Sequence, residues 1–447
     1  MGKLFGTDGV RGLANTELTP ELAFRLGRAA TYWFGRNYRR PTFFIGRDTR
    51  ISGEMLEAAL AAGICSAGGE AVLCGVVPTP AVAFLARKHG AQAGVVISAS
   101  HNPFPDNGIK FFAGSGYKLP DATEEELEKL VMAGKDELPR PTAEHIGTIR
   151  YRHDLLKEYI DYALSTVDVT FAGLKIVVDC ANGAAFEAAP AVLRHLGAEV
   201  VVINDKPNGV NINRDAGSTH LEGLQQEVIL RGADLGIAHD GDADRCLAVD
   251  ETGAVVDGDQ MMVICALEML RQGKLADNVL VATVMSNLGL HQAVKKAGGR
   301  VVVTPVGDRY VLEAMLTHGY GLGGEQSGHI IFGALSTTGD GLVTALQLIA
   351  AKVRAGRRLS ELATAMTRFP QVLVNVRVKS KAGWQDNETI TAAIAAAEKA
   401  LGEDGRVLVR PSGTEPLIRV MAEGPSQPEL ESLVERVAAV ISRELGS

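Results

Sequence analysis

The chain has 447 residues, 46% of them hydrophobic and 22% charged, which is enough for about three domains of ordinary size. A net charge of −8 without a basic block argues against nucleic acid as a partner, and no apolar run reaches the roughly 18 residues of a membrane span. Five scattered cysteines lack the spacing of a zinc site or a disulfide framework, so we expect a cytoplasmic protein with reduced thiols.

Strands and helices alternate along the first part of the chain. Thr19 and Pro20 predict the N-cap and first position of a helix that ends near residue 34. The next elements are expected in this order: a strand at 42–46, a helix capped by Ser52, a strand at 71–73, a helix after Pro80 and a strand at 94–97. This alternation is typical of a parallel or mixed sheet with helical crossovers.

A cluster of polar residues follows the buried strand at 94–97: Ser98, Ser100, His101 and Asn102. Such a strand delivers polar groups to the carboxyl edge of a sheet, where open α/β proteins bind ligands. Proline after Asn102 disfavours helix there, so the serines are predicted to lie on a tight loop. The alternative is an ordinary serine turn, in which the hydroxyls only satisfy local backbone groups.

The same pattern returns twice further along the chain. A glycine-marked helix end and a buried strand precede each new strand, and these new strands begin at Gly94, Gly236 and Gly321. Six residues beyond those glycines stand Ser100, Asp242 and Ser327. We therefore predict three similar α/β mixed-sheet domains, each of which offers one loop to a shared site.

Prolines and glycines that interrupt the predicted helices and strands suggest the domain boundaries. The three α/β domains are predicted at residues 1–150, 151–253 and 254–368. Residues 369–447 differ in character: valines alternate from 372 to 378, and a helix from about Trp384 to residue 401, two short strands and a last helix follow. This order predicts a small α+β domain with an antiparallel sheet.

Asp240, Asp242 and Asp244 form the strongest single motif. Three carboxylates at alternate positions point the same way in an extended chain, which suits a hard cation. A calcium loop is excluded because Arg245 stands where such a loop needs glycine, and because both flanks read as strands. Magnesium fits best, since three protein oxygens leave room for a phosphate oxygen. A solvated acidic turn is the alternative.

Two further loops carry polar side chains. The glycines at 319–324 match dinucleotide-binding spacing, but strand-like residues follow them, so Glu325, Ser327 and His329 are better explained as readers of a ligand. Residues 410–416, with Arg419 on the next strand, combine two hydroxyls, a glycine and two guanidiniums, which suits a phosphate. A bare structural loop and a surface turn, respectively, are the alternatives.

These motifs occur together over essentially the whole chain, and the combination resembles the α-D-phosphohexomutases. The segments that carry the resemblance are Phe5 to Gly12, the serine loop, the three-aspartate loop, Gly307 to Val311, Gly324 to His329 and Arg410 to Pro416. The resemblance implies three α/β domains and a fourth, TATA-binding-protein-like domain around a central cleft. It also implies interconversion of glucosamine 6-phosphate and glucosamine 1-phosphate for cell-wall precursor synthesis.

The resemblance further assigns roles to individual residues. Ser100, and not Ser98, corresponds to the family's phosphoserine, and Asp240, Asp242 and Asp244 correspond to its magnesium ligands, with a phosphate oxygen on Ser100 as the fourth. The substrate-binding residues it implies are Thr7, Gly307, Asp308, Arg309, Glu325, Ser327, Arg410, Ser412, Gly413, Thr414 and Arg419. A hexosamine or hexose 1,6-bisphosphate is implied as the phosphorylating activator, and a homodimer as the assembly.

Charge and proton transfer complete the predicted site. Arg11 and Arg245, with magnesium, would offset charge on the transferred phosphoryl group. His101 and Lys110, with His329 behind them, are candidates for proton transfer at the sugar hydroxyl. A sister mutase for mannose or glucose phosphates, a phosphoserine-dependent phosphatase and a non-catalytic sugar-phosphate sensor are the competing functions.

Overall fold

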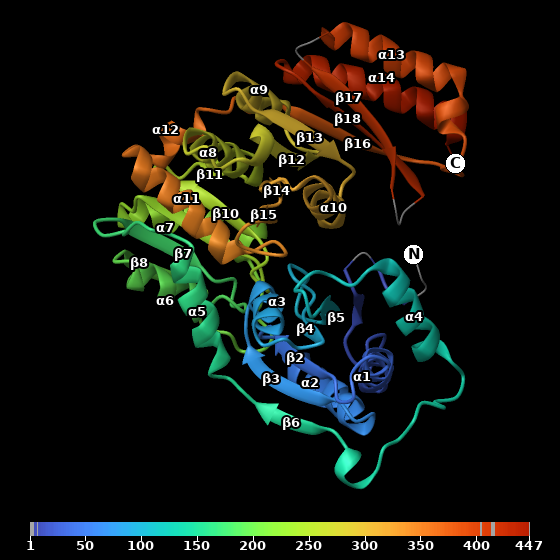
Figure 1. The fold of residues 1–447 in the computed structure, drawn as a ribbon. Coiled ribbons are helices and arrows are strands. Elements are labelled where there is room, and N and C mark those ends of the chain that lie inside the picture. The colour runs from blue at the N-terminus through green and yellow to red at the C-terminus, as the bar shows by residue number, and fades with distance from the viewer. Residues whose placement is uncertain (1–3, 7, 403–404, 413–415, 447) are drawn as a thin grey trace. The chain divides into compact units, whose positions relative to one another are not determined.

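The computed structural model describes residues 4–6, 8–402, 405–412 and 416–446. It divides into two compact units, which we call the large unit, Met1–Met285 with Ala297–Ala365, and the C-terminal unit, Ser286–Lys296 with Met366–Ser447. Within the described residues, no helix is both long and apolar enough to cross a membrane. The large unit contains three sheets and the C-terminal unit one (Figure 1).

The first sheet has six strands in the order β1-β5-β4-β2-β3-β6. Its strands are β1 Val10–Leu13, β2 Thr42–Arg47, β3 Glu70–Val76, β4 Ala93–Ile97, β5 Asp106–Ala113 and β6 Thr148–Tyr151, and the accompanying helices are α1 Pro20–Gly35, α2 Ser52–Ser66, α3 Thr79–Lys88, α4 Asp121–Met132 and the 3-10 turn η1 Ala143–His145. Strands β2, β3, β4 and β6 are parallel, whereas β5 is antiparallel to both of its neighbours. The predicted alternation of strands and helices is confirmed.

The two predicted helix starts differ in outcome. Thr19 caps α1 as expected, because its hydroxyl accepts a hydrogen bond from the Leu22 amide at 3.2 Å. The prediction that Ser52 caps α2 is wrong: Ser52 is the first helical residue, and Ile51 precedes it without a side-chain cap. The Ser52 hydroxyl instead accepts a hydrogen bond at 2.9 Å from Asn107 on β5.

The second and third sheets have the orders β11-β10-β9-β7-β8 and β13-β12-β14-β15. The second comprises β7 Lys175–Asp179, β8 Glu199–Ile203, β9 Leu235–His239, β10 Cys246–Asp250 and β11 Val255–Val256, with α5 Leu155–Ser165, α6 Ala188–His195, η2 Gly217–Thr219 and α7 Glu222–Arg231. The third comprises β12 Val279–Thr283, β13 Arg300–Thr304, β14 Leu322–Gly324 and β15 Ile330–Phe332, with α8 Gly258–Arg271, η3 Ala276–Asn278, α10 Asp308–His318, α11 Gly341–Ala355 and α12 Leu359–Ala363. The second sheet extends past residue 253, because β11 pairs with β10.

One buried contact joins α5 to α11 inside the large unit. Asp340 is the N-cap of α11, and its Oδ1 accepts hydrogen bonds from the Val343 amide at 2.9 Å and from the Tyr159 hydroxyl at 2.8 Å. Burial raises the pKa of Asp340 to about 6. The helix that begins the second predicted domain is thus tied to the third by a buried titratable group.

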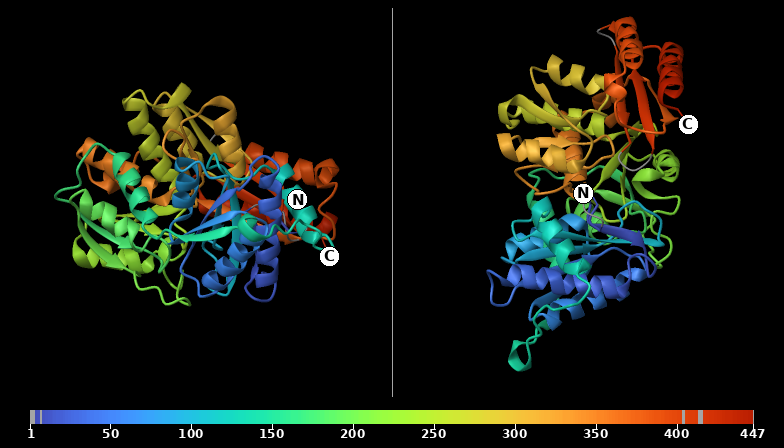
Figure 2. Two further views of the ribbon diagram at one scale, coloured as in Figure 1. Left: turned by 60° about the horizontal axis from the view of Figure 1, so that its bottom comes forward. Right: turned by 90° about the vertical axis from the view of Figure 1, so that its right-hand side faces the viewer.

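The C-terminal unit contains one antiparallel sheet in the order β16-β18-β17. Its elements are α9 Leu288–Lys296, β16 Gln371–Arg377, η4 Trp384–Asp386, α13 Glu388–Leu401, β17 Arg406–Pro411, β18 Leu417–Glu423 and α14 Gln427–Leu445. Helices α13 and α14 cover one face of the sheet (Figure 2) and bury Val376, Ile418 and Val434. Three mixed α/β sheets and this small antiparallel sheet confirm the predicted fold class.

Candidate active site

The two serines of the loop after β4 have different surroundings. The Ser98 hydroxyl donates to Asp48 Oδ2 at 2.5 Å and accepts from the Ser100 amide at 2.9 Å, which is the ordinary turn role. Ser100 has a left-handed backbone (φ 52°), and its hydroxyl donates to Asp240 Oδ2 at 2.6 Å. Both serines are buried, but only the Ser100 hydroxyl lies against the acidic loop.

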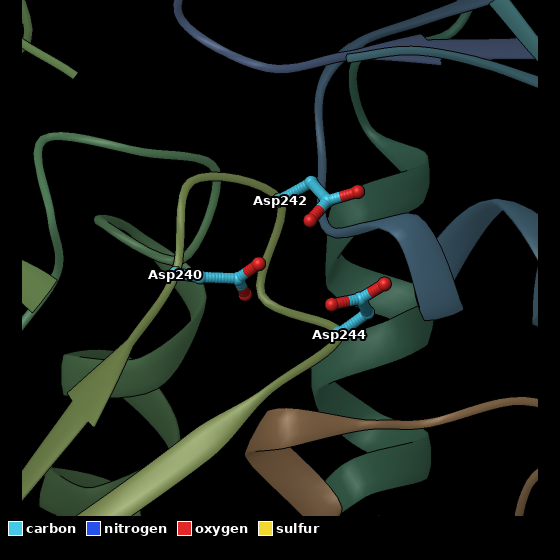
Figure 3. Close-up of side chains that lie close together, drawn as sticks. All are labelled: Asp240, Asp242 and Asp244. Atoms are coloured by element: carbon cyan, nitrogen blue, oxygen red, sulfur yellow. The ribbon is translucent and has the colours of Figure 1, made fainter. Parts of the chain in front are cut away.

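The three aspartates gather in the loop between β9 and β10 (Figure 3). Each offers an oxygen, and these oxygens lie within 4.8 Å of one another. The extended geometry expected from the alternate spacing is wrong, because the loop turns and Ala243 has a left-handed backbone (φ 58°). The turn brings the three carboxylates together. The spacing of the aspartates in the sequence does not predict it.

Two buried oxygens of this cluster suit a cation. Asp242 Oδ1 and Asp244 Oδ1 are buried and accept no hydrogen bond from the described residues, although Arg245 Nε lies 3.9 Å from Asp244 Oδ1. Asp242 Oδ2 accepts from the Thr79 hydroxyl at 2.7 Å and from Lys110 at 2.9 Å. Buried carboxylate oxygens without a donor cost free energy unless a positive charge meets them. A divalent metal of the Mg²⁺ type satisfies this oxygen set.

The pKa shifts of the three aspartates are consistent with a cation site. Burial and the two neighbouring carboxylates raise the pKa of Asp240 well above its usual range, and burial and Asp242 raise the pKa of Asp244. Burial opposes ionisation of Asp242 as well, but Lys110 and the Thr79 hydroxyl hold the pKa of Asp242 below its usual value. Burial and mutual repulsion therefore disfavour the ionised forms of Asp240 and Asp244, and a bound cation would offset both effects.

Lys110 on β5 lies between two carboxylates. Its Nζ is 2.9 Å from Asp242 Oδ2 and 3.0 Å from Asp8 Oδ2, and the side chain is buried. Burial lowers the pKa of Lys110, but Asp242 and Asp8 outweigh it and raise the pKa above the usual value. Lys110 is therefore a charged donor in this arrangement. Arg11 pairs with the same Asp8, a carboxylate that the sequence interpretation did not single out.

The two histidines of the predicted site differ in their partners. His101 Nδ1 lies 3.3 Å from the Ser100 hydroxyl, and burial together with Arg245 lowers the pKa of His101 to about 4. His101 is therefore neutral near pH 7. His329 is buried, its Nε2 lies 3.7 Å from Asp308 Oδ2, and neither of its ring nitrogens has a hydrogen-bond partner among the residues that the structure describes.

Some of the residues predicted to bind the sugar lie close together in the fold. Glu325 Oε1 accepts from the Gly307 amide at 3.1 Å, so the two segments meet. The Ser327 hydroxyl is buried, and none of the described residues is its hydrogen-bond partner. Arg309 pairs with Asp121, a carboxylate at the start of α4.

Lys118 is a further residue that the sequence interpretation missed. Its Nζ lies 2.8 Å from Asp8 Oδ1 and 2.6 Å from Asp308 Oδ2, so it links the N-terminal segment to the Gly307 loop. No motif surrounds Lys118 in the sequence, and only the fold brings its partners together. Thr79 was hidden for the same reason.

The predicted phosphate loop belongs to the C-terminal unit. Arg410 and Arg419 are cross-strand partners on β17 and β18, and burial and the charge of Arg419 lower the pKa of Arg410. The Ser412 amide donates to the Leu417 carbonyl at 2.9 Å, and Lys381, which the sequence analysis missed, donates to the Ser412 carbonyl at 2.7 Å. Two predicted residues of this loop, Gly413 and Thr414, and Thr7 of the large unit lie outside the described residues.

Four family models match the chain in sequence. They are described as phosphoglucomutase/phosphomannomutase alpha/beta/alpha domain I over residues 2–137, domain II over 157–253, domain III over 257–369, and the C-terminal domain over 373–440. Together they span almost the whole chain.

Curated and solved relatives agree with these matches. A phosphoglucosamine mutase of Symbiobacterium thermophilum is 58% identical over 447 residues, which cover 100% of each chain. The crystal structure of a phosphoglucomutase/phosphomannomutase family protein from Burkholderia thailandensis has the same fold, with a TM-score of 0.83, 24% identity and coverage of 98% of this chain and 97% of that one. A second structure, of Aspergillus fumigatus N-acetylphosphoglucosamine mutase with GlcNAc-6P and magnesium, has a TM-score of 0.71 and 19% identity, and covers 99% and 96% of the two chains.

Proposed function

This chain belongs to the phosphoglucomutase/phosphomannomutase family, and we propose that it acts as a phosphoglucosamine mutase that interconverts glucosamine 6-phosphate and glucosamine 1-phosphate. The observation that supports this most directly is the Ser100 hydroxyl, held 2.6 Å from Asp240 in an aspartate cluster that has two buried oxygens without a hydrogen bond from the described residues. A nucleophile and a candidate metal site so close together suit phosphoryl transfer.

The reaction proceeds through a phosphoserine and a sugar bisphosphate. The free hydroxyl oxygen of the sugar phosphate bonds to the phosphorus on Ser100 as the bond from phosphorus to the serine oxygen breaks, and the hydroxyl proton passes to a base. In the second half, the serine oxygen takes the other phosphoryl group from the bisphosphate, and the freed sugar oxygen regains a proton. The phosphoryl group never reaches water, and positioning and charge neutralisation provide the catalysis.

Four residues would hold and activate the phosphoryl group. Asp240, Asp242 and Asp244, with a phosphate oxygen on Ser100, would hold Mg²⁺. That ion would neutralise charge on the transferred group. The Aspergillus fumigatus enzyme was crystallised in complex with magnesium, which supports the choice of ion.

Charged and proton-carrying side chains surround that centre. Lys110 is held charged beside Asp242, so its role is to donate to the transferring group, with Arg11 and Arg245 as further cations. His101, a neutral imidazole 3.3 Å from the Ser100 oxygen, is one candidate for proton transfer. His329 is the alternative for proton transfer.

Substrate recognition is assigned to two groups of residues. Glu325 and Ser327, with Gly307, Asp308, Arg309 and Thr7, bind the sugar and the parts of the substrate near it. The C-terminal unit supplies Arg410, Ser412, Gly413, Thr414 and Arg419 for the phosphate that is not reacting. A hexosamine or hexose 1,6-bisphosphate as activator, a cytoplasmic location and a homodimer belong to the same proposal.

The experiment that tests the proposed function compares substrates. The purified protein, charged with Mg²⁺ and a trace of glucose 1,6-bisphosphate, is incubated separately with glucosamine, glucose and mannose 6-phosphates. We expect the highest kcat/KM for the conversion of glucosamine 6-phosphate into its 1-phosphate. Preference for glucose or mannose would indicate a sister mutase, and orthophosphate release without isomerisation would indicate a phosphatase.

A further inference from the structure

The peptide carbonyls of the serine loop point at a buried guanidinium. Arg50 Nη2 donates to the Ser100 carbonyl at 3.0 Å and to the Asn102 carbonyl at 2.7 Å, and its Nη1 donates to the carbonyls of Pro103 and of Asp106, the latter at 3.0 Å. The Arg50 side chain is fully buried. One side chain thus binds four carbonyl groups of a single loop.

A second donor reaches the same loop from the segment between β8 and η2. Asn213 Nδ2 donates to the Ser100 carbonyl at 2.8 Å and to the Asn102 carbonyl at 3.1 Å. The backbone N–H of Asn213 donates a hydrogen bond to the Ala181 carbonyl at 2.9 Å. Gly241 of the aspartate loop packs on the same group, because a Cβ there would lie 2.5 Å from the Ser100 carbonyl oxygen.

We propose that Arg50 and Asn213 are positioning residues for phosphoryl transfer, an inference that rests on the function proposed above. Together they hold Ser100 in its left-handed conformation, so that its hydroxyl faces Asp240. A non-glycine residue persists in this backbone region only where its surroundings over-determine it. Because Asn213 and the aspartate loop both belong to the region of the second sheet, Asn213 also fixes the serine loop relative to the candidate metal ligands.

Asn213 offers the cleaner test of the pair. Replacement of Arg50 would leave the buried Asp48 carboxylate without its cation and would destabilise the fold for that reason alone. Asn213→Ala removes the two donations, and Asn213→Asp, of almost the same size, turns a carboxylate oxygen toward two carbonyl oxygens. The matched control is Asn211→Ala in the same segment, because among the described residues the Asn211 side chain bonds only the backbone of Lys206 and Asn208.

The readout is the rate at which glucose 1,6-bisphosphate phosphorylates Ser100, followed by intact mass, together with kcat, KM and the Mg²⁺ dependence. We expect Asn213→Ala to slow serine phosphorylation and kcat by about 10- to 100-fold, with KM changed less than about threefold and thermal midpoint and Mg²⁺ dependence near wild type. Asn213→Asp should be slower still, and Asn211→Ala should match wild type.

Two results would overturn the proposal. One is wild-type phosphorylation of Ser100 in both Asn213 variants; the other is activity in Asn213→Asp restored to the wild-type level, which would mean that only the volume of the side chain matters. A failure of the proposed function is distinguishable, because the wild-type protein itself would then be phosphorylated without isomerising glucosamine 6-phosphate.

Discussion

The serine and aspartate loops of the large unit differ from the arginine-bearing strands of the C-terminal unit in how they are held. Ser100 and Asp242 are each 1% exposed, and their backbone and side chains are bound by partners from several loops. Arg410 and Arg419 are half-buried and face each other across two strands, although like charges repel. The first region holds its groups in fixed positions, whereas the second places two positive charges side by side, which suits the phosphate site proposed there.

This difference predicts where mutations act. Loss of a group in the large unit should lower the rate of phosphoryl transfer, whereas loss of an arginine in the C-terminal unit should weaken substrate binding. The first three of the following predictions test that division, and the last two concern substrate preference and stability within the large unit.

The largest effect is expected at Ser100. Ser100→Ala should lower isomerase activity on the order of 10⁴-fold or more, because no hydroxyl remains to carry the phosphoryl group. Ser98→Ala should lower it less than about tenfold, since Ser98 only joins Asp48 to the Ser100 amide. Steady-state kinetics and thermal melts of both variants check this. Comparable losses in the two variants would refute the choice of Ser100 as nucleophile.

The next effect concerns the candidate metal ligands. Asp242→Asn removes one formal charge from the cluster and leaves an amide facing Lys110, so half-maximal activity should need at least about tenfold more Mg²⁺. A titration of activity against Mg²⁺ measures the change. Equal turnover with Ca²⁺ would contradict the proposal that these residues would hold Mg²⁺ beside the phosphoryl group.

Arg419→Ala tests the other side of the comparison. Loss of a charge-assisted hydrogen bond to phosphate, worth about 1.5–3 kcal/mol, should raise KM for glucosamine 6-phosphate by roughly 10- to 100-fold. The extent of Ser100 phosphorylation and the Mg²⁺ dependence should stay at the wild-type level. If phosphorylation of Ser100 by bisphosphate were lost without a change in KM, the division of labour between the two units would be wrong.

Glu325→Ala should have a smaller, substrate-dependent effect. Its carboxylate already accepts from the Gly307 amide, so part of any loss reflects that loop. The remaining decrease in kcat/KM should be about tenfold larger for glucosamine phosphates than for glucose phosphates, because a carboxylate favours an ammonium group. Equal proportional losses on both substrates would mean that Glu325 only orients the ring.

The smallest effect is on stability and depends on pH. Folding raises the pKa of Asp340 from its ordinary 3.8 to about 6, so the folded state favours the protonated carboxyl. Stability from this group is present below about pH 4 and is lost as the pH rises through 6. Asp340→Asn keeps an oxygen for Tyr159 and Val343 without the charge, so it should melt a few degrees above wild type at pH 8 and equally at pH 4. A lower melting temperature at pH 8 would contradict this assignment.

Sequence reasoning recovered the fold class and the motif loops, because hydrophobic runs and glycine breaks report local structure directly. It could not separate Ser98 from Ser100 by residue type, since the difference lies in a left-handed backbone and in which loop each hydroxyl meets. Asp8 and Lys118 were missed because only the folded chain brings them together, 110 residues apart. The turn at Ala243 was likewise invisible, since alanine gives no signal for a left-handed backbone.

The transfer of the phosphoryl group from Ser100 to the sugar is the central claim, and a single-turnover experiment tests it most directly. The protein is labelled on Ser100 with radioactive phosphate from glucose 1,6-bisphosphate, freed of excess label and mixed with one equivalent of glucosamine 6-phosphate and Mg²⁺. The label should leave the serine and appear in glucosamine 1,6-bisphosphate and then in glucosamine 1-phosphate. Label that stays on the protein, or that appears only as orthophosphate, would contradict the account.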